Sequence, residues 1–145
     1  MNPKRFEDIP AWQDAMRLGD RVVTLLEHPY FGARRGLADQ LDRAAVSVSN
    51  NIAEGFERGT TPALITFLYY AKGSAGEVRS MLHGLAKRAT APGSKIQDSR
   101  VEIHDLIKLA ESVSRQLHGW ADYLQNTELQ GIRHVNAQTR DADER

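Results

Sequence analysis

Apolar residues recur along this chain at steps of three and four, the spacing of an α-helix that buries one face. Four segments carry the pattern, at about residues 11–28, 36–57, 62–89 and 99–125. The inward stripes of the first two are expected to be Trp12, Ala15, Met16, Val22, Val23 and Leu26, then Leu37, Leu41, Ala44, Ala45, Val48, Ile52 and Phe56. Those of the last two are Leu64, Phe67, Leu68, Ala71, Ala75, Val78, Leu82, Leu85 and Ala89, then Ile103, Leu106, Ala110, Val113, Leu117, Trp120 and Leu124.

Helix-breaking and helix-capping residues separate the four segments. Pro10, Pro29 and Gly59 mark ends, and "TTP" predicts Thr61 as the N-cap of the third helix with Pro62 in its first turn. For the fourth helix, Ser99 with Glu102 and Ser94 with Gln97 each have capping-box spacing.

No strand pattern, internal repeat or second domain is visible, and the connections between the long helices are short. Neighbouring helices should therefore be antiparallel. We expect an all-α, up-down-up-down four-helix bundle over residues 1–125, with residues 126–145 as a frayed or disordered polar tail.

The second helical segment carries unusually many small and polar residues in "RAAVSVSNNIAEGFERG". On a helical wheel that starts at Leu41, one polar stripe falls between about 180° and 280°. This stripe, here called the polar seam, consists of Gln40, Arg43, Ser47, Asn50, Asn51, Glu54 and Arg58.

Ser, Asn and Gly each cost a helix up to about 1 kcal/mol relative to Ala. Their short side chains let another backbone come close, which favours a seam against another subunit or a ligand. The alternative is that Asn50 and Asn51 cap or kink a helix that breaks there. Glu54 with Arg58, and Asp39 with Arg43, have the spacing of weak supporting ion pairs.

The formal net charge is zero, but the charges are unevenly distributed. Residues 72–100 hold six basic and two acidic residues, whereas residues 101–145 hold five and eight. On the third helix, Lys72, Arg79, His83 and Lys87 form a basic edge about 22 Å long, with Arg88 next to it and no acid on the same line. Such an edge could bind nucleic-acid phosphates, and the alternative is a solvated face balanced by the fourth helix. No aromatic residue is interleaved with it, which argues against base stacking.

Other chemistry finds little support in the sequence. The chain has no Cys, and "KGSAG" at residues 72–76 lacks the order of a phosphate-binding loop, so its small residues are expected to serve close helix packing. His104, Glu111 and His118 recur every seven residues, too far apart for one metal ion. No nucleophile motif, signal peptide or membrane-spanning run is present. We expect a cytoplasmic, non-enzymatic protein without metal or cofactor.

Three stretches resemble the bacterial four helix bundle protein family, whose founding members are encoded by intervening sequences in 23S rRNA genes. They are "FEDIPAWQDA" from Phe6, "GLADQLDRAAVSVSNNIAEG" from Gly36 and "AKGSAGEV" from Ala71. The resemblance implies a ring-like homopentamer. It also points to related accessory proteins of diversity-generating retroelements, which bind nucleic acid and a reverse transcriptase.

Residues and resemblance together predict a homo-oligomer, pentameric by the resemblance, that binds RNA or DNA through the basic edge repeated by symmetry. The competing prediction is a protein-interaction scaffold, or an accessory subunit of a protein such as a reverse transcriptase, without nucleic-acid affinity. An enzyme or ligand carrier inside the bundle ranks last, because the inward residues are apolar.

Overall fold

The computed structural model describes residues 3–127. They form four α-helices: α1 (Pro10–Leu26), α2 (Arg35–Glu57), α3 (Thr61–Ala89) and α4 (Arg100–Asn126). Three short 3-10 turns accompany them: η1 (Phe6–Asp8), η2 (Pro29–Ala33) and η3 (Gln97–Ser99). The predicted polar tail lies, from residue 128 onward, outside the described residues.

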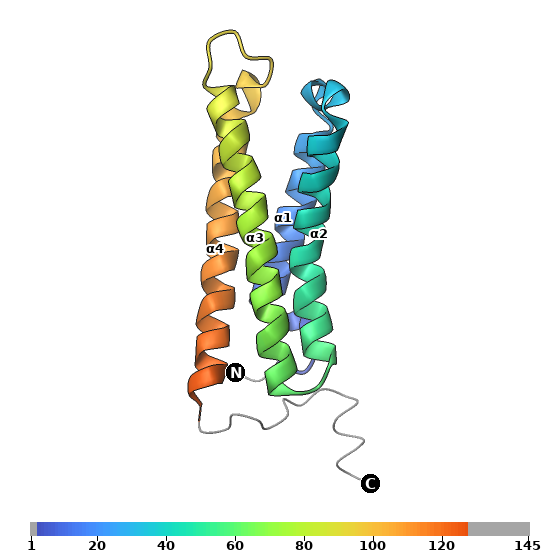
Figure 1. Cartoon of the computed structure of the whole chain (residues 1–145), viewed down its shortest axis with the longest axis vertical. Helices are drawn as coiled ribbons and strands as arrows, with labels where there is room; N and C mark the ends of the chain where they lie inside the picture. Colours follow the sequence, from blue (N-terminus) through green and yellow to red (C-terminus); the bar gives the residue numbers. More distant parts are fainter. Residues whose placement is uncertain (1–2, 128–145) are drawn as a thin grey trace.

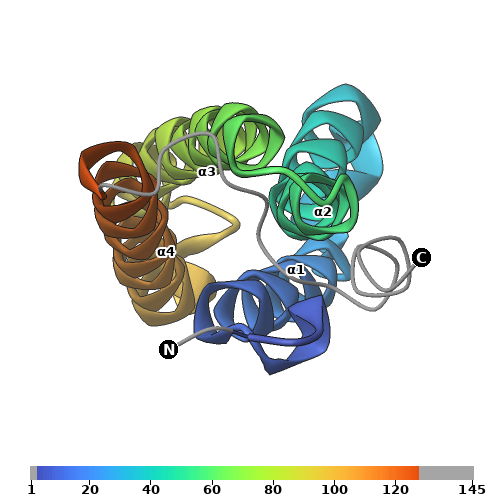
Figure 2. The same cartoon turned by 90° about the horizontal axis from the view of Figure 1, so that it is seen from below.

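Successive helices run antiparallel, and α1 packs against α4 to close the bundle (Figures 1 and 2). The turns after α1 and after α3 lie at one end, and the turn after α2 lies at the other (Figure 1). Between residues 3 and 127 there is no strand. The predicted all-α four-helix arrangement is confirmed.

The core contains almost all of the predicted stripes. On α3, the eight residues from Leu64 to Ala89 that recur at three- and four-residue steps are buried, and only Phe67 of the predicted nine is partly exposed. The prediction was wrong for part of α1, where Met16 and Val23 are 40% and 47% exposed. The buried stripe there is Ala11, Ala15, Leu18, Val22 and Leu25. Because α1 has apolar residues on more than one face, its sequence alone did not fix which face turns inward.

The helix ends differ from the predicted caps. α3 is capped by Thr60, whose hydroxyl accepts a hydrogen bond from the Ala63 backbone N–H at 3.3 Å, so Thr61 is already the first helical residue. Ser99 precedes α4 but makes no side-chain capping bond, and the Ser94 hydroxyl accepts from the Ile96 N–H instead. Neither predicted capping box forms, because the η3 turn occupies the space before α4.

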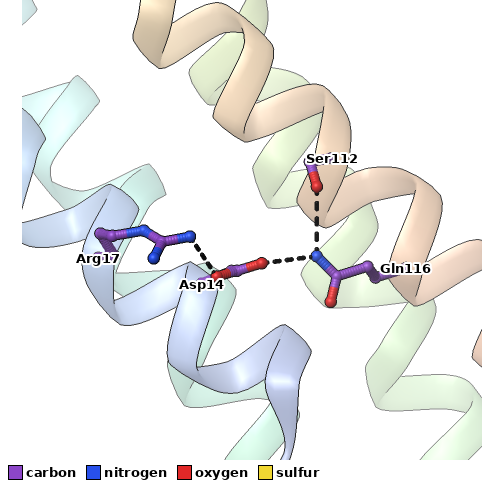
Figure 3. Close-up of polar contacts among 4 residues, drawn as sticks. All are labelled: Asp14, Arg17, Ser112 and Gln116. Atoms are coloured by element: carbon purple, nitrogen blue, oxygen red, sulfur yellow. Dashed lines mark hydrogen bonds and ion pairs between the residues drawn. The ribbon is translucent and has the colours of Figure 1, made fainter.

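Polar contacts between α1 and α4 close the bundle (Figure 3). The Gln116 side-chain amide donates to the Asp14 carboxylate at 2.8 Å and lies 3.3 Å from the Ser112 hydroxyl, and Arg17 donates to the other Asp14 oxygen (Figure 3). Higher on the same interface, Arg21 donates two hydrogen bonds to Glu102, at 3.1 and 3.2 Å. The hydrogen bond with Glu102 raises the pKa of the Arg21 guanidinium above its usual value.

The connections at the two ends of the bundle are fixed by local contacts. His28 Nε2 lies 2.9 Å from an Asp98 carboxylate oxygen, which joins the turn after α1 to the turn after α3. At the other end Gly59 adopts a left-handed backbone with φ of 82°, which ends α2 and reverses the chain into α3. These contacts hold the helices in register.

Candidate nucleic-acid interface

An open groove runs between α3 and α4. We call it the α3–α4 groove; it has a volume of about 720 Å³. Its lining residues come from both helices: Tyr69, Lys72, Gly73, Gly76 and Arg79 from α3, and Glu111, Ser114, Arg115, His118 and Gly119 from α4. The groove therefore combines half of the predicted basic edge with a part of α4.

Cationic side chains dominate the groove. Lys72 Nζ donates to His118 Nδ1 at 3.2 Å, a contact that joins α3 to α4. Glu111 supplies the one carboxylate of the lining, and Arg115 lies 3.9 Å from it on the next turn of α4. Arg79 has no ion-pair partner among residues 3–127. Lys72, Arg79 and Arg115 thus line the groove together with a single carboxylate, that of Glu111, which lies near Arg115.

The floor of the groove is made of backbone and small side chains. A Cβ added at Gly73, Gly76 or Gly119 would meet no atom of a neighbouring element within 4 Å. Beside them, Ser114 is 9% exposed, and its hydroxyl makes no hydrogen bond within the described part of the chain. A ligand could therefore approach the helix backbones closely and find a free hydroxyl there.

The predicted basic edge is only partly one surface. Lys72 and Arg79 line the groove, while His83 and Lys87 are exposed further along α3, outside its lining. Arg88 lies apart from them, because its guanidinium points to the Tyr30 hydroxyl, 3.4 Å away in the η2 turn. Arg88 lies about 160° around the helix from Lys72, so it belongs to a different face of α3.

Two residues outside the predicted basic edge also line this groove. Tyr69 lies in the groove three residues before Lys72, so an aromatic side chain does accompany the basic residues. Glu111 faces them from α4, so the fourth helix supplies an acid opposite the basic residues, as the alternative of a balanced face expects. The three-residue spacing between Tyr69 and Lys72 in the sequence already indicates that both lie on the same side of the helix. By contrast, Ser114, Arg115 and His118 could be assigned only once the register of α4 against α3 was known.

The small residues of "KGSAG" also divide between two surfaces. Ala75 is buried in the core, and Ser74 faces α2, where its hydroxyl lies 2.9 Å from that of Ser47. Gly73 and Gly76 line the open groove, where an added Cβ would meet no neighbouring element within 4 Å, contrary to the prediction of close packing.

Part of the polar seam on α2 makes hydrogen bonds within the same chain. The Asn51 amide donates to the Ser47 carbonyl at 2.8 Å and to the Ser47 hydroxyl at 2.9 Å, and Ser47 is the residue that meets Ser74. A second groove of about 490 Å³ follows this contact between α2 and α3. The short side chain of Ser47 is therefore explained by its contact with α3, and Asn51 supports Ser47 from within α2.

The other five seam residues are exposed: Gln40, Arg43, Asn50, Glu54 and Arg58. Arg58 donates to Glu54 at 3.0 Å, as predicted, whereas the expected pair of Asp39 with Arg43 does not form in residues 3–127. A shallow hollow of about 420 Å³ runs along the seam from Asp42 to Glu54. α2 continues to Glu57 without interruption, so Asn50 and Asn51 neither cap nor break it.

Over residues 3–127, no three His, Asp or Glu side chains are grouped closely enough to hold a metal ion. In the same range, none of the helices combines the length and the apolar character needed to cross a lipid bilayer.

The chain is similar to a known protein family. The model of the family described as 23S rRNA-intervening sequence protein matches residues 7–119. This range begins in η1 and covers both helices of the α3–α4 groove up to Gly119. No curated protein matches the chain.

Proposed function

The chain belongs to the 23S rRNA-intervening sequence protein family, and we propose that it is a non-enzymatic, cytoplasmic homo-oligomer that binds nucleic acid, with RNA as the expected ligand. The observation that carries this proposal is the α3–α4 groove, in which Lys72, Arg79 and Arg115 converge on one open surface.

Charge and shape both favour a phosphate chain as the ligand. Unpaired or weakly paired cations attract phosphates, and the affinity then depends on salt because bound counterions are released. The glycine floor lets a sugar–phosphate backbone come close to the helices. Lys87 extends the cationic surface along α3 beyond the groove, with the exposed His83 one turn before it.

One chain offers few charges, so affinity is expected to come from repetition. In a closed oligomer each subunit presents the same groove, and a ligand long enough to reach two of them binds with higher avidity. We assign the subunit contact to the exposed part of the polar seam, where Val46 adds an apolar side chain that is 46% exposed. The resemblance described above implies five subunits.

A mobility-shift titration of the purified protein with RNA at low and high salt tests the proposal. Replacing Lys72, Arg79 and Lys87 by Gln should abolish a salt-sensitive shift. The matched control replaces Lys4, Arg35 and Lys95, which are exposed, outside the groove and equal in charge. Absence of wild-type binding at low salt, or equal loss in both variants, would contradict the proposal.

Light scattering before and after nuclease treatment separates the two parts of the proposal. An oligomer should have a mass that is a multiple of 16.2 kDa and should keep it after nuclease treatment. A stable oligomer that binds no nucleic acid would instead favour the scaffold function.

A further inference from the structure

From the position of Tyr69 we infer that the ligand of the α3–α4 groove is a single strand, one base of which stacks on the Tyr69 ring. The inference rests on the proposed function, because it concerns the same groove. Beyond the proposed function, it specifies that the nucleic acid is single-stranded and that Tyr69 is the residue that selects it.

Tyr69 is held in place and is still accessible. Its hydroxyl donates to the Gln125 side-chain carbonyl at 3.3 Å, which ties the ring on α3 to α4. The residue is nevertheless 40% exposed. An aromatic ring that is tethered through its hydroxyl and still partly exposed loses little entropy when a base stacks on it.

The groove orders its parts as a single strand requires. Tyr69 lies at one end, Lys72 follows one turn later, and Gly73 and Gly76 lead to Arg79. The distance along α3 from Tyr69 to Arg79 is about 15 Å. At 3.4 Å per nucleotide of a stacked strand, this length corresponds to roughly four nucleotides.

A duplex cannot use this arrangement fully. Its bases are stacked inside the helix, so it could offer the groove its phosphates but no free base face. A single strand offers both at once. In addition, the buried Ser114 hydroxyl can bond to a sugar hydroxyl or a phosphate that lies on the glycine floor.

The test compares Tyr69→Leu and Tyr69→Phe with the wild-type protein. The matched control is Tyr123→Leu, since Tyr123 is a 65% exposed tyrosine on α4 outside the groove lining. Each protein is titrated with an unstructured RNA of roughly 10 nucleotides and, at the same salt concentration, with a duplex of the same length. The strand carries 2-aminopurine, whose fluorescence falls when it stacks on an aromatic ring.

The wild-type protein should bind the single strand at least about tenfold more tightly than the duplex and quench the probe. Tyr69→Leu should lose the quenching and weaken single-strand binding by roughly 5- to 150-fold, with little effect on the duplex. Tyr69→Phe should keep the quenching, because the ring remains, and Tyr123→Leu should behave as wild type.

The two proposals fail in different ways. If the wild-type protein binds single strand and duplex equally, and Tyr69→Leu changes neither, the stacking inference is wrong while nucleic-acid binding stands. If the wild-type protein binds neither at low salt, the proposed function itself is wrong.

Discussion

The backbone of Gly55 on α2 passes so close to Phe67 on α3 that a Cβ added to Gly55 would lie 2.6 Å from the Phe67 Cβ. Real Cβ atoms do not approach to this distance, and the obstructing atom is next to the α3 backbone. α2 and α3 can therefore pack closely at this level only because residue 55 has no side chain. This contact accounts for one of the weak helix formers in the second segment.

Gly55→Ala should destabilise the fold. Alanine favours a helix by about 1 kcal/mol over glycine, but forcing α2 and α3 apart costs about 1–3 kcal/mol, so we expect a net loss of stability. Gly84→Ala is the matched control, since a Cβ there meets nothing within 4 Å and the variant should be more stable than wild type. Urea unfolding measures both changes, and a Gly55→Ala protein as stable as the control would contradict the close approach.

The Asp14–Gln116 hydrogen bond should couple α1 to α4. Removing each partner and both together, as Asp14→Ala and Gln116→Ala, should give a coupling free energy of about 1 kcal/mol in a double-mutant cycle. The exposed pair of Glu54 and Arg58 lies within one helix, and the same cycle there should give only about 0.3–0.5 kcal/mol. A coupling near zero for Asp14 and Gln116 would show that the contact does not hold the bundle closed.

Blocking the groove without changing its charge should weaken RNA binding. Gly76→Leu places a side chain on the floor, where an added Cβ meets no neighbouring element within 4 Å, so the fold should be kept while phosphates are held away from Lys72 and Arg79. We expect at least a tenfold loss of affinity, measured by fluorescence anisotropy. Gly84→Leu, on α3 but outside the groove lining, should bind as wild type.

The salt dependence should report the number of phosphates held. For a single strand, the slope of log K against log salt is about −0.7 for each phosphate neutralised, so Lys72, Arg79 and Arg115 predict a slope of about −2 per subunit. Arg79→Gln should lower its magnitude by about 0.7. An unchanged slope would mean that Arg79 does not contact phosphate.

A bulky residue on the exposed part of the polar seam should separate the subunits. Asn50 is exposed and makes no hydrogen bond within residues 3–127, so Asn50→Trp should leave the fold intact while it prevents close approach of a second copy. Light scattering should then give the mass of a single chain. Lys108→Trp, an exposed position on α4, should keep the oligomer, and an Asn50→Trp protein of unchanged mass would place the subunit contact elsewhere.

Helix existence could be predicted well because it depends on local spacing. The α3 stripe from Leu64 to Ala89 follows a regular period, and its eight predicted positions other than Phe67 are buried. The prediction failed where several faces were apolar. Met16 and Val23 lie about 80–100° around α1 from Ala15, and only the packing of α2 and α4 decides which side is covered.

The candidate site was predictable only along one helix. The spacing of Lys72 and Arg79 in the sequence places them on one face of α3. The same helical spacing also places Tyr69 near that face, so Tyr69 could have been predicted as part of the site. His118, Arg115 and Ser114 come from a segment some forty residues further along the chain, as the Lys72–His118 bond across 46 positions shows. Their place depends on the register of α4 against α3, which no local pattern encodes.

By itself, the sequence determined four amphipathic helices, their approximate limits and their family, because these depend on periodicity, on turn residues and on local composition. The tertiary structure alone decided that Ser47 meets Ser74, that Gly55 makes room for Phe67, and that half of the basic edge faces a groove completed by α4. The physical reason is that these relationships depend on the rotation and the register of one helix against another. Both are set by the fit of side chains distant in the sequence.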